Sequence, residues 1–143
     1  MLKLILTFTL FVAPLMMQAQ VLIDNTRLNH DFVVLLNAYR KQNGLDLVVL
    51  DEPSIYRAKL QAQHCSKIKE LTHDCPNWFP DRWAECALWN WQEPNAKVNL
   101  EQWQDSPPHN ELLLLDGASK IGIYYSFGIW DGEEGYYAVL VIN

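Results

Sequence analysis

The sequence predicts an α+β layered domain with helices on both faces of its sheet. Helical patterns fill most of the chain, while residues 120–130 and 135–143 are rich in β-branched and aromatic side chains. The segment DGEEG between these two runs supplies a turn, so together they predict a C-terminal β-hairpin. Apolar residues run almost without a break along both strands, which indicates that helices cover both faces.

Four helices are expected ahead of the hairpin. In the first, residues 28–42, apolar side chains recur at i, i+3, i+4 and i+7, and Gly44 suits a left-handed cap. Residues 45–50 then read as a short extended link. The remaining helices are expected at about 53–69, 95–104 and 107–115.

Residues 1–20 have the layout of a secretory signal peptide and not of part of the fold. Lys3 precedes a long apolar run that ends in small and polar residues, so cleavage is expected after Ala19 or Gln20. An N-terminal membrane anchor is the alternative. Residues 21–143 have the size of one domain, which we expect to be secreted or periplasmic, with no membrane span after signal removal.

The charge balance is acidic. The chain has 11 basic and 17 acidic side chains and a formal charge of −6, and loss of Lys3 with the signal peptide makes this −7. No basic stripe offsets this charge, so nucleic acid is excluded as a partner.

Three cysteines remain after signal removal: Cys65, Cys75 and Cys86. Export to an oxidising compartment predicts one disulfide and one free thiol, and the residues alone leave all three pairings open. A zinc site formed by these thiols and His73 is the alternative, although the spacings match no C-x-x-C ligand pattern.

The stretch DSPPHNELLLL, residues 105–115, predicts a capped helix with a histidine in its first turn. Ser106 suits the N-cap and Pro107 the first helical position. The positive end of a helix disfavours protonation of His109, and a neutral imidazole accepts a proton or binds a metal. A partly exposed histidine without a special role is the alternative. A Ser106–His109 nucleophile pair is disfavoured because capping employs the hydroxyl. The leucines at 112–115 lie on more than one face and predict all-round burial.

Residues 72–86 read as a long aromatic loop, of the kind that often carries a site. His73 and Glu85 lie at its two ends and are weaker candidates when taken alone. Its tryptophans could stack on sugars, although packing is the simpler explanation.

These motifs follow one another along the chain. Residues 35–74 contain N-x-x-R, then a G-x-x-x-L link, then a helix of spaced alanines ending at a loop histidine. The matching positions are Asn37, Arg40, Gly44, Ala58, Ala62 and His73. WAEC carries Glu85, WQDSPPHNELLL carries Trp103, Ser106, Pro107 and His109, and KIGIYY follows. In this order they resemble the CAP superfamily, or SCP domain, in its bacterial-type branch, over most of residues 30–143.

The resemblance implies an α-β-α sandwich with a small antiparallel sheet and a cleft faced by His73, His109 and Glu85. It implies that the two histidines can hold a divalent metal, zinc or magnesium. If His73 and Glu85 meet in one cleft, their neighbours Cys75 and Cys86 are expected to pair. The chain departs from the family where Ala84 and Cys86 flank the glutamate, and where Ser106 replaces a second glutamate, as in bacterial members.

The resemblance implies a secreted binding module for a small apolar ligand, a divalent metal or an extracellular surface partner. The alternative is a metal-assisted, peptidase-like hydrolase in which Glu85 is the general base and a metal on His73 and His109 activates water. A carbohydrate binder that uses exposed tryptophans is a third possibility.

Overall fold

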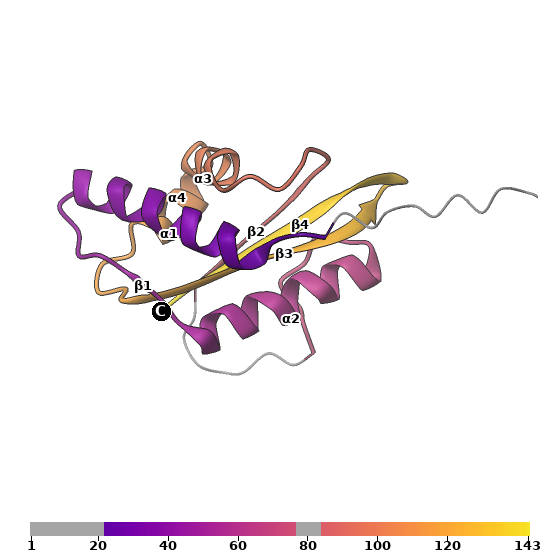
Figure 1. The fold of residues 1–143 in the computed structure, drawn as a ribbon, viewed down its shortest axis with the longest axis horizontal. Coiled ribbons are helices and arrows are strands. Elements are labelled where there is room, and N and C mark those ends of the chain that lie inside the picture. The colour runs from indigo at the N-terminus through magenta and orange to yellow at the C-terminus, as the bar shows by residue number, and fades with distance from the viewer. Residues whose placement is uncertain (1–21, 77–83) are drawn as a thin grey trace, which may run out of the picture.

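The computed structural model describes residues 22–76 and 84–143 (Figure 1). The predicted signal peptide, residues 1–20, lies outside this part of the chain, as do residues 77–83 of the aromatic loop. The elements are α1 (Asn25–Gln42), β1 (Val49–Leu50), α2 (Glu52–Ile68), β2 (Ala84–Asn90), α3 (Ala96–Gln104), α4 (Pro107–Leu113), β3 (Lys120–Trp130) and β4 (Glu133–Ile142). Within the described ranges, no helix combines the length and apolarity needed to span a bilayer.

The strands form one four-stranded sheet in the order β1-β3-β4-β2. The predicted hairpin is present as β3 and β4, and β2 joins β4 in antiparallel orientation. The small antiparallel sheet that the resemblance implies is present in β3, β4 and β2, and one short strand is added to it. The end of the predicted extended link pairs in parallel with β3 through Val49 and Leu50, which makes the sheet mixed.

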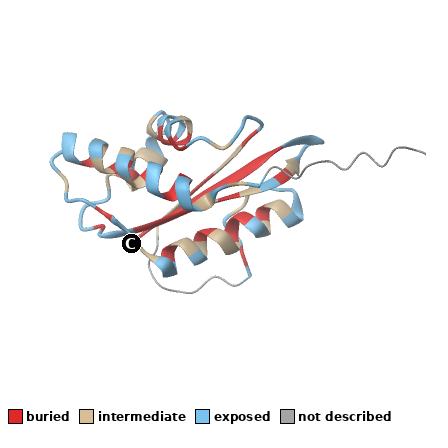
Figure 2. Ribbon diagram, viewed as in Figure 1, coloured by how far each residue is buried: buried red, intermediate tan, exposed pale blue. Residues whose placement is uncertain are grey.

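Helix α2 covers one face of the sheet, and α1, α3 and α4 lie on the other (Figure 1), so the predicted sandwich is confirmed. Strand β4 is buried along most of its length (Figure 2), and its buried side chains alternate between the two faces, as the pleat requires. The β4 residues that face α1, α3 and α4 are Tyr136, Ala138, Leu140 and Ile142. Val139 and Val141 face α2, whose Ala58 and Ala62 allow a close approach.

Strand β2 lies where the sequence predicts the end of a loop. Its residues, AECALWN, include no β-branched side chain, so local propensity does not indicate a strand. The strand instead depends on antiparallel pairing with β4 from Ala84↔Ile142 to Asn90↔Tyr136. Because β3 occupies one side of β4, β2 pairs on the other side and becomes an edge of the sheet.

Two asparagines of α1 protect the edge of β3 where β1 has ended. The side chain of Asn25 accepts a hydrogen bond from the Tyr125 N–H at 2.7 Å and donates to the Tyr125 carbonyl at 3.1 Å. One helical turn later, the Asn29 carboxamide accepts from the Ile123 N–H at 3.0 Å. These side chains replace a missing strand, which satisfies buried backbone groups and blocks edge-to-edge association.

Arg40, near the end of α1, is 1% exposed. Its guanidinium donates to the carbonyls of Asp46 at 2.9 Å, Leu113 at 2.9 Å and Leu115 at 3.1 Å, and lies 3.5 Å from the carbonyl of Ala118. One side chain therefore joins the loop after α1, the end of α4 and the turn into β3.

Helix α4 is shorter and less buried than the sequence predicts. It ends at Leu113, which is fully buried, while Leu115 is 38% exposed. The chain leaves the helix here to reach the turn at Gly117, whose φ of 77° is left-handed. All-round burial of the leucine run is therefore wrong.

Replacing Gly122 by alanine is expected to destabilise the fold. A Cβ on this β3 residue would lie 2.1 Å from the Ile55 nitrogen and 2.3 Å from the Ser54 carbonyl carbon, both backbone atoms of α2. We expect urea unfolding to show a loss of about 1–3 kcal/mol or more, because the helix must move. Gly132→Asn is the control, since its surroundings are open and asparagine tolerates its φ of 83°. An equal or larger loss in the control would contradict this explanation.

Candidate functional site

The structure brings His73 and Glu85 together. Nδ1 of His73 donates to Oε1 of Glu85 at 2.6 Å. The imidazole is 58% exposed, whereas the carboxylate side chain is only 4% exposed. A buried carboxylate therefore holds the ring at the surface, and the hydrogen bond fixes the proton of the neutral ring on Nδ1.

The backbone around His73 is held by Gln61, a buried polar residue on the inner side of α2. Its amide donates to the Thr72 carbonyl and accepts from the Cys75 N–H at 3.1 Å, so it fixes both sides of the histidine. Gln61 is not among the site residues predicted from the sequence. The available signal was a glutamine next to Ala58, Ala62 and Cys65 on the buried stripe of the helix.

Glu85 reaches His73 because of its position on β2. Ala87, two residues further on, packs in the cluster between the sheet and α2, whereas Cys86 belongs to the core on the opposite face. Glu85 therefore points toward the α2 side, where the segment after that helix places His73. The pairing of Glu85 with Val141 fixes the position of the carboxylate along the strand direction.

Hydrogen bonding to Glu85 raises the pKa of His73, partly opposed by burial and assisted by the negative charges of Glu85 and Asp74. Burial raises the pKa of Glu85, and the interactions with His73 oppose this shift. The two groups therefore stabilise one another in their charged forms, although burial disfavours the charge on each.

His109 lies at the start of α4, and its Nδ1 shares a hydrogen bond of 2.9 Å with the Ser106 hydroxyl. Ser106 is the N-cap residue, as predicted, but its hydroxyl does not make the expected hydrogen bond to the helix backbone. The hydroxyl hydrogen-bonds to the imidazole instead of the helix backbone. Capping therefore does not occupy the Ser106 hydroxyl, and this objection to a Ser106–His109 pair no longer applies.

Burial lowers the pKa of His109, and the positive charge of His73 lowers it further. The expected neutral imidazole therefore agrees with the direction of the shift, although its causes are burial and a second histidine. The backbone carbonyl of His109 also lies 3.9 Å from the Cys86 thiol, which ties the start of α4 to β2.

The imidazole rings of His73 and His109 are both held through Nδ1. Each has Nδ1 engaged, by Glu85 for His73 and by Ser106 for His109, and no described residue hydrogen-bonds to either Nε2. An imidazole oriented through Nδ1 is the usual arrangement behind a metal-binding Nε2. Among the described residues, however, no group of three or more His, Cys, Asp or Glu side chains is arranged to hold a metal ion. The zinc alternative with three thiols and His73 has no support.

The Cys75–Cys86 disulfide is not formed in the structure. Cys65, Cys75 and Cys86 are buried free thiols. Cys75 lies beside α2, with its thiol 3.8 Å from the Leu60 carbonyl, whereas Cys86 lies in the core across the sheet. Neighbours of two touching residues need not meet, since successive side chains of a strand point to opposite faces.

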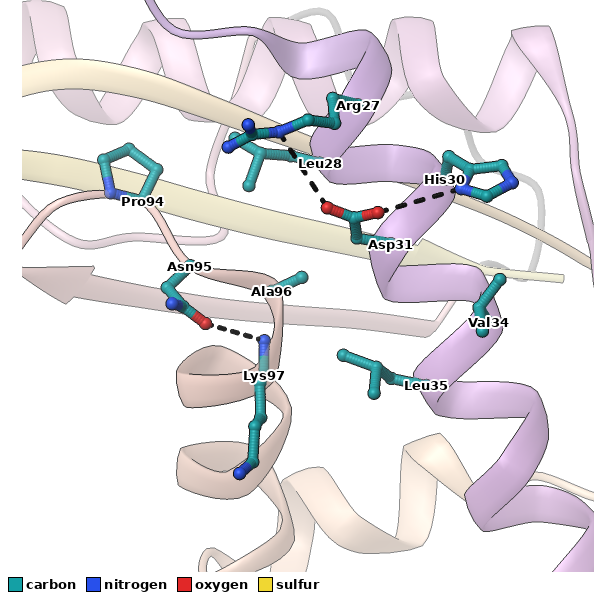
Figure 3. A pocket seen from close by; sticks show the side chains of 10 residues that line it. All are labelled: Arg27, Leu28, His30, Asp31, Val34, Leu35, Pro94, Asn95, Ala96 and Lys97. Atoms are coloured by element: carbon teal, nitrogen blue, oxygen red, sulfur yellow. Dashed lines mark hydrogen bonds and ion pairs between the residues drawn. The ribbon is translucent and has the colours of Figure 1, made fainter.

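Three pockets formed by described residues lie away from this pair. One of about 360 Å³ lies between α1 and the start of α3 (Figure 3). There Asp31 pairs with Arg27 at 3.9 Å and lies 3.7 Å from Nδ1 of His30, so basic side chains already face the carboxylate. A pocket of about 450 Å³ lies beside the start of α2, and one of about 240 Å³ lies at the end of the hairpin. His73, Glu85 and His109 line none of the three.

This chain belongs to the CAP family, since residues 33–141 match the profile described as the Cysteine-rich secretory protein family. An outer surface protein from Borrelia burgdorferi has a similar fold, with a TM-score of 0.69, 19% identity and coverage of 85% of this chain and 96% of that chain. No curated protein matches the chain by sequence.

Two further solved structures contain the fold within longer chains. One is an extracellular protein with an SCP domain from Bacillus anthracis, with a TM-score of 0.58, 18% identity and coverage of 82% of this chain and 41% of that chain. The other is a cysteine-rich secretory protein from Staphylococcus aureus, with a TM-score of 0.60, 15% identity and coverage of 83% of this chain and 39% of that chain. At such identities the likeness establishes the fold alone.

Glu85→Gln is expected to lower the pKa of His73, measured by NMR titration of its imidazole protons. Because the folded-state pKa is raised, the stabilisation from protonated His73 is complete below the ordinary histidine value and is lost as pH rises through the raised value. The variant should lose this pH dependence. Asp74→Asn, which removes a weaker contribution, should lower the pKa less. A larger effect of Asp74→Asn would contradict the assignment.

Cys86 is expected to resist alkylation in the native protein. Burial, assisted by the charge of Glu85, raises the pKa of its thiol to about 12, so little reactive thiolate exists near neutral pH. Iodoacetamide labelling followed by peptide mass spectrometry should be slow in buffer and fast in urea. Cys86→Ser identifies the labelled peptide, and rapid native labelling of Cys86 would refute its burial.

Proposed function

We propose that this protein is an exported binding module whose His73, Glu85 and His109 line a cleft for a small ligand, a divalent metal or a surface partner. Export follows from the predicted signal peptide at residues 1–20. It agrees with the extracellular and outer-surface descriptions of the structural relatives.

The observation that carries this proposal is the 2.6 Å hydrogen bond between His73 and Glu85. It orients one imidazole from behind, through a carboxylate that solvent hardly reaches. Gln61 fixes the chain around His73, and Ser106 orients His109 in the same manner. Such preorganisation lowers the entropy cost of binding a polar group.

A divalent metal would be held by Nε2 of His73 and of His109, with water or the ligand completing its coordination. Imidazole nitrogens suit zinc better than magnesium, which prefers oxygen. With two protein ligands the affinity would be modest. A bound zinc ion would supply Lewis acidity, and the chain's own part would be to orient the two rings.

The hydrolase alternative is less well supported. Glu85 as general base would have to reach a water, yet its carboxylate is 4% exposed and already hydrogen-bonded to His73. A catalytic zinc also needs a third protein ligand, for which the described residues offer no candidate arrangement.

Zinc titration by calorimetry tests the proposed site. We expect the wild-type protein and His30→Ala to bind zinc equally, because His30 is an exposed histidine of α1. His73→Ala and His109→Ala should each weaken binding by about tenfold or more. Equal uptake by His109→Ala and the wild-type protein would eliminate the two-histidine metal site.

Incubation with a peptide library separates binding from hydrolysis. The binding module should leave the library intact, with or without zinc. Cleavage that disappears in Glu85→Gln would replace this proposal with the hydrolase.

A further inference from the structure

A second site lies at the far end of β2 from Glu85. It is a pocket of about 240 Å³ where the segment before α1, the loop after β2, the last part of β3 and the start of β4 meet. Trp91 and Phe127, which line it, are 70% and 52% exposed. Exposed aromatic side chains that gather at one concave place are typical of binding surfaces.

The charges of this pocket all have one sign. Glu93 and Glu134 line it, and none of its described lining residues is lysine, arginine or histidine. This differs from the pocket of Figure 3, where Arg27 and His30 face Asp31. A pocket lined by both carboxylates and aromatic rings favours a cation with an apolar or flat surface.

The pocket is preformed by the register of the sheet. Its floor is Tyr136, which is 1% exposed and hydrogen-bonded through its hydroxyl to Asn99 at 3.0 Å. The loop that carries Trp91 is anchored by Asn90, whose side chain accepts from the Gln92 N–H at 2.9 Å. Walls fixed in this way can bind without first paying the entropy of their own ordering.

The end of β3 is anchored as well. The hydroxyl of Ser66, on α2, donates to the Phe127 carbonyl at 2.5 Å, and Phe127 pairs with Tyr136 in the sheet. At Gly135 a Cβ would lie 2.3 Å from the Asn90 carbonyl oxygen, so this glycine allows β4 and β2 to close the pocket from behind.

We propose that this pocket binds the arginine side chain of a basic extracellular peptide or protein. A guanidinium can stack on an indole while its fork donates to a carboxylate, whereas an ammonium is a more strongly hydrated point charge. The volume is below the ~300–1,000 Å³ of pockets for drug-sized ligands, so it suits one side chain. The net charge, −6 for the full chain and −7 once Lys3 is lost with the signal peptide, favours encounter with a basic partner.

Two-dimensional NMR of the full chain tests the proposal, with the capped tripeptide Gly-Arg-Gly as the probe. The peptide should shift the indole N–H of Trp91, assigned with Trp91→Phe, and binding should weaken as salt is added. The same peptide with citrulline, a neutral isostere of arginine, should not bind. Trp91→Ala and Glu134→Gln should each weaken binding by about fivefold or more.

Glu133→Gln is the matched control, since it removes an exposed carboxylate next to Glu134 that does not line the pocket. This control and His109→Ala should bind the arginine peptide within about twofold of the wild-type protein, because their changes lie outside the pocket. His109→Ala thus separates this site from the proposed histidine cleft.

Four results would overturn the proposal: equal affinity for the citrulline peptide, an equal loss in Glu133→Gln and Glu134→Gln, no shift at millimolar peptide, or ethylguanidinium binding as tightly as the peptide. The last would assign the pocket to a free organic cation.

Discussion

The buried guanidinium of Arg40 is the interaction on which one whole face of the sandwich depends. Burial lowers the pKa of Arg40, against the opposing charges of Asp116 and Asp46, so the charge is retained at a cost that only full hydrogen bonding offsets. The carbonyls that it binds lie in the segment after α1 and at the C-terminal end of α4. Carbonyls at a helix end have no hydrogen-bond donor within the helix, and the Arg40 side chain supplies one. Because α4 is held at its C-terminal end in this way, its first turn can present His109 beside β2.

The other half of the candidate site depends on the edge strand. Glu85 faces α2 because β2 pairs with β4 in one register, and a shift by one residue would send the carboxylate into the opposite core. The same pleat separates Cys86 from Cys75. His73 is then positioned by Gln61, so the site combines a helix, a loop and a strand that are distant in sequence.

The sequence was most informative where local pattern and tertiary role agree. The helices of periodic segments, the left-handed Gly44 and the hairpin are present as predicted, because each follows from spacing or turn chemistry. β2 could not be predicted, since its stability comes from β4 and not from its own residues. The contact between His73 and Glu85 became an expectation only through the family resemblance. The bond between the Ser106 hydroxyl and His109 could not be predicted, because capping preferences carry no information about a histidine ring one turn away.

The two proposed sites lie at opposite ends of the same strand. From Glu85 to Trp91 the chain advances six residues, about 20 Å in extended conformation, which exceeds the range over which neighbouring side chains couple directly. Glu85 works from the α2 side of the sheet, whereas Trp91 follows the last residue of the strand. A short peptide that places an arginine beside Trp91 would therefore leave His73 and His109 uncovered. Under the two proposals, a short basic segment at one end of β2 and a small ligand at the other do not compete for the same side chains.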